Sequence, residues 1–208
     1  MSVLNEFKPV VYVVDDDASV RHGLGTLLDV SGYAVEDFAS GEALLERDPQ
    51  GLGCILLDVR MGGMDGLAVQ RALLQSGNPL PVIFLTAFSD VPRIVQAVKE
   101  GAEDFFIKPV DGAQLVNRVQ QVLEDYALRM EGERERMNFT RKMSALTDRE
   151  REVLTLSLDG MSCKDIGAQL GVSYRTVELH RSHICTKAGT ANLSDLFFLV
   201  AKLGMNFV

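Results

Sequence analysis

The chain has 208 residues, a length that allows one large domain or two small ones. Hydrophobic residues make up 47% and charged residues 24% of it, which excludes collagen-like, low-complexity and wholly disordered classes. The net charge of −8 is uneven: residues 1–123 hold 9 Lys and Arg against 17 Asp and Glu, whereas residues 124–143 hold 5 of each and residues 144–208 hold 7 of each. This asymmetry predicts two modules with different functions. The C-terminal module has no net negative charge that would repel nucleic acid.

Residues 1–123 alternate short apolar runs with helical patterns. The runs that predict strands are 10–14, 34–38, 54–57, 81–85 and 104–107. Apolar residues recur at helical spacing in the stretches 20–28, 67–74, 94–98 and 115–123. Apolar runs without polar alternation are typical of a parallel sheet covered on both faces. We therefore predict an α/β module of five strands interleaved with five helices, a doubly wound sheet in the flavodoxin-like order 2-1-3-4-5.

Residues 124–143 are rich in charge and Met, and we interpret them as a linker. Apolar spacing from Val119 to Met130 lets the preceding helix continue into it, although Gly132 weakens a helix by about 1 kcal/mol relative to Ala. A flexible tether and a continuous helix therefore remain equal alternatives. Residues 144–208 predict an all-α module with helices at 147–158, 162–170, 173–187 and 193–203.

Polar residues stand where the strands of residues 1–123 end, which is where a doubly wound sheet places its chemistry. A cluster of carboxylates there suits Mg²⁺ better than Zn²⁺, for which His or Cys would be expected. A carboxylate beside Mg²⁺ and a lysine is a candidate nucleophile toward a phosphoryl group. Asp17 and Asp90 are better interpreted as helix caps. The predicted site residues at the strand ends are Asp15, Asp16, Asp58, Thr86 and Lys108.

Four segments around these positions resemble the receiver domain of bacterial two-component response regulators: VVDDDASVR, ILLDVRMGGMDG, FLTAFSDVP and EDFFIKPV. The resemblance covers residues 9–123. It implies that Asp58 accepts a phosphoryl group from a sensor histidine kinase. It also implies that Asp16 binds Mg²⁺ directly with support from Asp15, and that Arg60 contributes its backbone carbonyl.

The same resemblance implies how the receiver would switch. Lys108, whose bond to Pro109 is commonly cis in this family, would pair with the phosphoryl oxygens. Thr86 would swing toward the phosphoryl group while Phe105 rotates inward. One departure is Gly62, where the family has proline; because glycine loses more backbone freedom on ordering, we expect a looser loop and weaker Mg²⁺ binding before phosphorylation.

The helices predicted at 162–170 and 173–187 are joined at Gly171 with the spacing of a helix-turn-helix. Residues 145–203 resemble the LuxR-type DNA-binding domain, and the chain as a whole is similar to the NarL/FixJ group of response regulators, most to its FixJ branch. Three residues, Cys163, Gly167 and Ala188, depart from the family pattern and predict a less rigid helix pair. The last helix, with Leu196, Leu199, Val200 and Leu203 in one stripe, is the expected dimer face, with core packing as the alternative.

The resemblance also implies which residues contact DNA. Glu178, Leu179 and Ser182 would face base edges in the major groove. His180 is either a backbone contact or a packing residue, and His183 is a weaker candidate. The residues expected to fix the register on the phosphate backbone are Lys164, Ser173, Arg175, Thr176, His180, Arg181 and Lys187.

Together these features predict a phosphorylation-dependent transcriptional regulator that is not an enzyme beyond its own phosphotransfer and autodephosphorylation. Its expected partners are a sensor histidine kinase, a double-stranded DNA operator, a second copy of itself on phosphorylation and RNA polymerase. A receiver whose C-terminal helices bind a protein remains an alternative. A phosphohydrolase that uses Asp58 as nucleophile would need a second carboxylate as general acid and a substrate pocket, for which the sequence offers no pattern.

The expected location is the cytoplasm. No apolar run approaches the roughly 18 residues that span a bilayer. The first ten residues lack a basic start followed by an apolar core. Cys54, Cys163 and Cys185 are far apart without CxxC spacing, so we expect reduced thiols with no metal or disulfide role.

Overall fold

The computed structural model describes residues 8–87, 95 and 98–205. The chain divides into two compact units, Met1–Arg129 and Met130–Val208. Most of the helix predicted at 94–98, and Asp90 as its cap, lie outside the described residues. None of the helices within the described ranges is long and apolar enough to cross a membrane.

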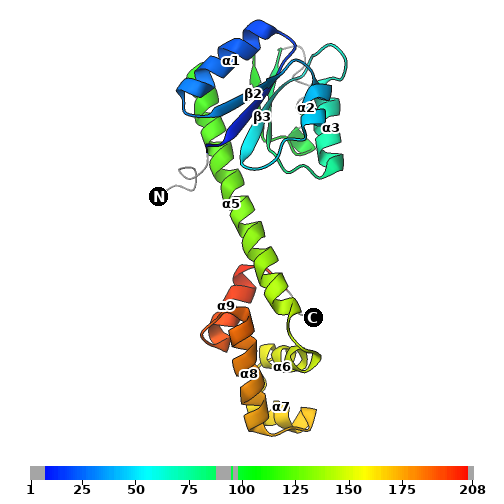
Figure 1. The fold of residues 1–208 in the computed structure, drawn as a ribbon, viewed down its shortest axis with the longest axis vertical. Helices are drawn as coiled ribbons and strands as arrows, with labels where there is room; N and C mark the ends of the chain where they lie inside the picture. The colour runs from blue at the N-terminus through cyan, green and yellow to red at the C-terminus, as the bar shows by residue number, and fades with distance from the viewer. Residues whose placement is uncertain (1–7, 88–94, 96–97, 206–208) are drawn as a thin grey trace. The chain divides into compact units, whose positions relative to one another are not determined.

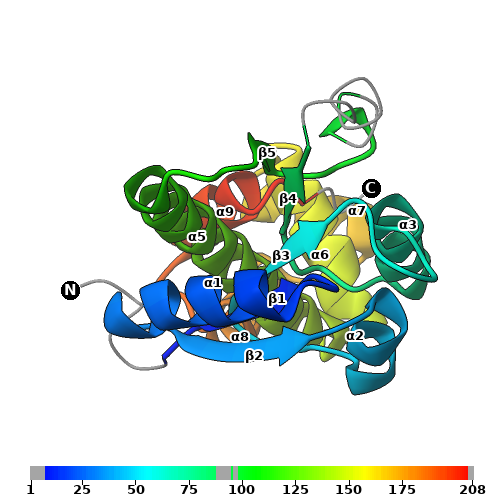
Figure 2. The same cartoon turned by 90° about the horizontal axis from the view of Figure 1, so that it is seen from above.

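The N-terminal unit contains an all-parallel sheet (Figures 1 and 2). Its strands are β1 (Val10–Val14), β2 (Ala34–Phe38), β3 (Gly53–Asp58), β4 (Val82–Thr86) and β5 (Asp104–Ile107). They pair in the order β2-β1-β3-β4-β5, which confirms the predicted flavodoxin-like topology. All residues of β3 and β4 are buried, as expected for central strands that are covered on both faces.

Helices cover both faces of this sheet. The helices of the unit are α1 (Ala18–Val30), α2 (Gly41–Arg47), α3 (Gly66–Ser76) and α5 (Gly112–Ser144). Figures 1 and 2 show α1 and α5 on one side of the sheet and α2 and α3 on the other. Asp17 accepts a hydrogen bond from the Ser19 N–H at the start of α1, so the prediction that it is a cap is confirmed.

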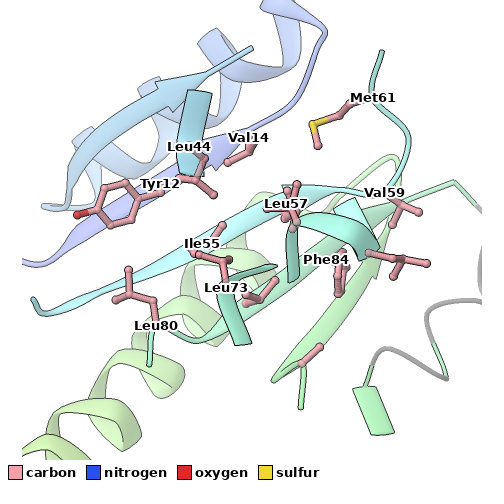
Figure 3. Packing of buried hydrophobic residues seen from close by; sticks show 14 of the residues in the cluster. Tyr12, Val14, Leu44, Ile55, Leu57, Val59, Met61, Leu73, Leu80 and Phe84 are labelled. Atoms are coloured by element: carbon pink, nitrogen blue, oxygen red, sulfur yellow. The ribbon is translucent and has the colours of Figure 1, made fainter. Parts of the chain in front are cut away.

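Two apolar clusters separate the sheet from its helices. One joins strand residues such as Ile55 and Phe84 to Leu44 of α2 and Leu73 of α3 (Figure 3). The other joins the opposite face of the strands to α1 and α5. Because alternate residues of a strand point to opposite faces, the same buried strands supply both clusters. This double core holds the carboxyl ends of the strands in fixed register.

The helix α5 has 33 residues and includes the whole of 124–143. Of the two alternatives for the linker, the structure has the continuous helix. Its first part buries Leu115 and Val119 in the N-terminal unit. Its last part buries Phe139 and Met143 in the C-terminal unit. Each unit is thus completed by a segment of this one helix.

The C-terminal unit is all α, as predicted. After the end of α5 it contains α6 (Asp148–Leu158), α7 (Cys163–Leu170), α8 (Tyr174–Ala188) and α9 (Leu193–Lys202) around one apolar core. α6 begins with a capping box, in which the Thr147 side chain and the Glu150 side chain each accept from the other's backbone N–H. Ser162, Ser173 and Asn192 cap the three following helices.

A tight turn at Gly171 joins α7 to α8, as the sequence predicted. α7 ends at Gly171, whose φ of 68° lies in the left-handed region that favours glycine. A Cβ on Gly167 would lie 2.8 Å from the Val172 carbonyl oxygen. Gly167 therefore allows the start of α8 to approach α7 closely, and the expectation of a less rigid pair stays a prediction.

The apolar stripe of α9 is part of the core. Leu196, Val200 and Leu203 are buried and Leu199 is half-buried, all packed in the C-terminal cluster. This burial within one chain confirms the alternative of core packing for Leu196, Val200 and Leu203. The large apolar side chain that α9 exposes is Phe198, at 74%.

Candidate functional site

Three carboxylates meet at the carboxyl end of the sheet. Asp15 and Asp16 directly follow β1, and Asp58 is the last residue of β3. One carboxylate oxygen of each lies within 4.8 Å of those of the other two. Asp15 and Asp58 are buried, at 1% and 7% exposed, whereas Asp16 is exposed. The prediction that the strands bring these residues together is confirmed.

Lys108, the residue after β5, joins the cluster as its cation. Its Nζ lies 2.7 Å from Asp15 Oδ2 and 3.1 Å from Asp58 Oδ1. Burial raises the pKa of Asp58 above its ordinary value, and the positive charge of Lys108 only partly offsets this. Burial acts to lower the pKa of Lys108, but its hydrogen bond to Asp15 and the charges of both carboxylates raise it. Lys108 therefore stays protonated beside carboxylates that are held close together.

Backbone N–H groups orient the three carboxylates. The Val59 N–H donates to Asp58 Oδ1 at 2.9 Å, and the Asp17 N–H donates to Asp15 Oδ1 at 2.9 Å. The Gly62 N–H donates to Asp16 Oδ2 at 3.1 Å. The loop that we expected Gly62 to loosen thus contributes a hydrogen bond to a predicted metal ligand. The effect of Gly62 on Mg²⁺ binding stays a prediction.

Arg21 supports the site and was not singled out from the sequence. Its guanidinium donates to the backbone carbonyls of Asp15 at 2.7 Å and Asp16 at 3.1 Å, and pairs with Asp37 at the end of β2. It is the last residue of the segment VVDDDASVR, whose acidic residues carried the prediction of a site. The signal available was its position one turn into α1, where a long cation can reach back over the strand end.

The loop after β3 is closed by a near contact with the backbone of Asp58. The Gly66 N–H donates to the Val59 carbonyl at 3.0 Å. A Cβ on Gly66 would lie 2.2 Å from the Asp58 carbonyl oxygen, so only glycine fits there. Glu42 accepts from the Met64 N–H at 2.9 Å, and backbone hydrogen bonds of this kind lower the pKa of Glu42. The loop is therefore tied at both ends.

The predicted switch residues lie on the neighbouring strands β4 and β5. Thr86, the last residue of β4, is fully buried, and its hydroxyl donates to the Ala87 carbonyl at 3.1 Å. Phe105 is half-buried against the apolar cluster that faces α2 and α3. The Lys108–Pro109 bond is cis, as the resemblance implied. Arg60, expected to offer its backbone carbonyl, directly follows Val59 and is exposed.

Most of the predicted DNA-contacting residues are exposed and belong to α7, to α8 or to the cap of α8. Thr176 and His180 are half-buried, and His180 Nδ1 is buried without a hydrogen-bond partner among the residues described. This environment favours the packing alternative for His180. The Ser173 and Thr176 hydroxyls lie 2.9 Å apart and are hydrogen-bonded. The exposed residues of the set are Lys164, Ser173, Arg175, Glu178, Leu179, Ser182 and His183.

Two of the basic residues predicted to contact phosphates bond inside the unit. Arg181 donates to Ser157 Oγ at 3.0 Å and to the Met161 carbonyl at 2.9 Å. Lys187 pairs with Glu150 at 2.6 Å and donates to the Ala145 carbonyl at 3.0 Å. Both were proposed from their position on the predicted recognition helix, where sequence cannot reveal partners from other helices.

Comparisons with known proteins agree with both units. A model of the response regulator receiver domain matches residues 11–120, and a model of the luxR family of bacterial regulatory proteins matches residues 144–200. The transcriptional regulatory protein TdiR of Thauera aromatica is 39% identical over 193 residues, which cover 92% of this chain and 85% of that protein. The transcriptional regulatory protein FixJ of Azorhizobium caulinodans is 38% identical over 196 residues, which cover 94% and 93%.

Solved structures extend this likeness to the whole chain. The response regulator StyR superposes with a TM-score of 0.86 at 39% identity, and the match covers 94% of this chain and 100% of the StyR chain. Full-length FixJ from B. japonicum gives a TM-score of 0.60 at 32% identity, covering 96% and 98%. These matches support DNA binding and lend no support to the protein-binding alternative. The chain therefore belongs to the NarL/FixJ family of two-component response regulators and is a phosphorylation-dependent regulator of transcription.

Proposed function

We propose that Asp58 accepts a phosphoryl group from a sensor histidine kinase and that this modification controls operator binding by α8. One observation carries the proposal: the Asp58 carboxylate ends a buried strand 3.1 Å from the ammonium of Lys108 and beside two more carboxylates. A nucleophilic carboxylate needs cationic groups to offset its repulsion by the phosphoryl oxygens. Lys108 is placed to do this for Asp58.

The transfer is an in-line displacement at phosphorus. The Lys108 and Val59 hydrogen bonds both fall on Asp58 Oδ1, so we assign the attack to Oδ2. The new bond joins Oδ2 to phosphorus while the bond from phosphorus to the kinase histidine nitrogen breaks, and its electron pair returns to the imidazole. The acyl phosphate later reacts with water, which gives slow autodephosphorylation.

The donor set at the strand ends fits Mg²⁺. Three carboxylates within 4.8 Å of one another offer hard oxygen ligands, with no His or Cys among them. Asp15, Asp16, Asp58 and the Arg60 backbone carbonyl are the groups we assign to hold the ion. When bound, Mg²⁺ neutralises negative charge on the phosphoryl oxygens. The Gly62 and Asp17 N–H groups keep the Asp16 and Asp15 carboxylates oriented in its absence.

Phosphorylation would act through Thr86 and Lys108. The Thr86 hydroxyl would leave the Ala87 carbonyl for a phosphoryl oxygen, which vacates space for Phe105 to rotate inward. The altered surface would favour a receiver dimer, which can hold two DNA half-sites about one helical turn, roughly 34 Å, apart. The modification must stabilise the active state more than the inactive one, and couplings of about 1–3 kcal/mol are typical.

The experiment uses a small phosphodonor with the full chain. Wild type, Asp58→Ala and Asp17→Ala are incubated with acetyl phosphate and Mg²⁺, and intact mass reports the phosphoryl groups added. Light scattering with beryllofluoride, a phosphoryl mimic, reports the oligomeric state. We expect one phosphoryl group and a dimer for wild type and for the cap variant Asp17→Ala, and neither for Asp58→Ala. Equal phosphorylation of Asp58→Ala would overturn the assignment.

A further inference from the structure

Two helices of the C-terminal unit, α6 and α7, carry no basic residue in their own last turn. The end of a helix has unpaired carbonyl groups and a partial negative charge, which a nearby cation stabilises. The other helices of the unit supply such cations themselves, from Arg141 and Lys142 in α5, Lys187 in α8 and Lys202 in α9.

At the end of each of these two helices, an arginine from another helix supplies the missing cation. Arg181 of α8 donates to Ser157 Oγ in the last turn of α6 and to the Met161 carbonyl just beyond it. It thereby spans the corner at Gly160, where φ is 82°. Arg149 of α6 donates to the carbonyl of Leu170, the last residue of α7. Each arginine therefore joins two helices of the helix-turn-helix unit.

The partners of Arg181 are built to receive it. Ser157 is 4% exposed, and its hydroxyl hydrogen is already donated to the Val153 carbonyl at 2.6 Å. Its oxygen can therefore only accept, and Arg181 is the donor that meets it. Turning Arg181 toward a DNA phosphate would leave this buried acceptor and the Met161 carbonyl without their bonds, which is costly. Arg175, two turns earlier on α8, is exposed and under no such constraint.

We propose that Arg181 and Arg149 are positioning residues that fix α8 and α7 against α6, and that Arg181 does not neutralise a DNA phosphate. This replaces the backbone contact expected of Arg181. The bonds of Arg181 fix the rotation of α8 about its axis and its position along α6. They thereby set how Glu178, Leu179 and Ser182 are presented to base edges. The inference rests on the proposed reading of DNA by α8.

The test compares Arg181→Gln with Arg175→Gln, a matched change on the same helix. The full chain with Mg²⁺ and beryllofluoride is titrated over a range of salt onto two labelled duplexes, one selected by wild type from a random pool and one unrelated. Loss of one phosphate contact lowers the slope of log affinity against log salt by about 0.9. We expect Arg175→Gln to lose about one unit of slope on both duplexes while keeping the ratio between them.

For Arg181→Gln we expect an unchanged salt slope, unchanged affinity for the unrelated duplex, and about a tenfold loss of preference for the selected one. Ser157→Ala, which keeps every charge, is expected to reproduce part of this loss and to be non-additive with Arg181→Gln. A merely structural role would lower affinity for both duplexes by the same factor.

Other results overturn the inference in distinct ways. A lower slope for Arg181→Gln on both duplexes would show a phosphate contact and refute the positioning role. An equal loss on both duplexes, in this variant and in Ser157→Ala, would reduce the role to stability alone. A wild type that shows no preference for its selected duplex would instead refute base reading by α8, the proposed function on which the inference depends.

Discussion

The two units of the chain use charged side chains in opposite ways. The N-terminal unit gathers three carboxylates at one sheet edge against the single ammonium of Lys108. The C-terminal unit distributes basic side chains to carbonyl groups at or just beyond the ends of other helices, through Arg149, Arg181 and Lys187. An unbalanced cluster responds strongly to an added ion or phosphoryl group. A set of internally paired charges instead fixes the geometry of a surface, which suits reading DNA.

The largest effect on Mg²⁺ binding is expected from removing the cation of the receiver cluster. Lys108→Met leaves Asp15 and Asp58 without the ammonium that both contact. Mg²⁺ should then bind about tenfold more tightly, which corresponds to about 1.4 kcal/mol, a fraction of the several kcal/mol by which unit charges this close interact. Isothermal titration with Mg²⁺ measures this. Lys8→Met, which removes an exposed pair with Asp29 at 3.5 Å, is the control and should change nothing. Equal or weaker binding by Lys108→Met would show that the carboxylates are not the ligands.

The next effect concerns the backbone around Asp58. Gly66→Ala would place a Cβ against the Asp58 carbonyl and should destabilise the N-terminal unit by about 3 kcal/mol, at the upper end for overpacking. Gly62→Ala, whose Cβ meets nothing within 4 Å, should leave stability nearly unchanged. Urea unfolding followed by tyrosine fluorescence is suitable, because three of the four tyrosines, Tyr12, Tyr33 and Tyr126, belong to this unit. Equal stability of the two variants would contradict the close packing at Gly66.

A smaller, pH-dependent effect is expected at Glu150 in the C-terminal unit. Burial opposes the charged form, but the hydrogen bonds from Lys187 and Thr147 outweigh it, and the pKa of Glu150 is lowered. Its contribution to stability is therefore present above its unfolded pKa and lost as pH falls through the lower folded value. Glu150→Gln should cost about 2 kcal/mol at neutral pH.

Thermal unfolding across an acid series separates Glu150 from other carboxylates. The difference in the free energy of unfolding between wild type and Glu150→Gln should be largest at neutral pH and should shrink below about pH 4. Glu178→Gln, at an exposed position of α8, should behave as wild type throughout. A Glu150→Gln difference that is constant with pH would mean that the lowered pKa does not contribute to stability.

The smallest effect is expected at Gly62. Gly62→Ala keeps the N–H that bonds Asp16 and restricts the loop, so Mg²⁺ affinity should rise by no more than about threefold. Proline would restrict the loop too but would remove that N–H, which makes alanine the cleaner substitution. The same titration measures the change, and unchanged or weaker binding would discard the view that Gly62 keeps this loop mobile.

The sequence was most informative about the sheet. Short runs rich in apolar residues located all five strands, and because parallel strands end at one edge, Asp15, Asp58 and Lys108 could be expected to meet there. The helix α2 was not located, since its seven residues are too few to show a helical period. The role of Arg21 was missed because its position one turn into α1 is the signal that the sequence offers, whereas its bonds to the Asp15 and Asp16 carbonyls appear only in the structure.

The C-terminal unit shows a different limit. Caps such as Ser173 and the helical periods placed the helices well, because those signals are local. The stripe of α9 could not be assigned to core or dimer face, since periodicity reports only that one face is apolar. Arg181 and Lys187 have partners 24 and 37 residues earlier in the chain, and no local pattern reveals such contacts. Which charges are available to DNA therefore required the structure.

The central claim, that Asp58 controls DNA binding, is tested most directly by affinity for a duplex that the activated wild type selects from a random pool. Wild type and Asp58→Ala are each titrated with and without Mg²⁺ and beryllofluoride at one salt concentration. We expect the mimic to raise wild-type affinity about 5- to 150-fold and to leave Asp58→Ala at the basal level. Equal affinity of both proteins with and without the mimic would contradict the claim and show that DNA binding is not gated by Asp58.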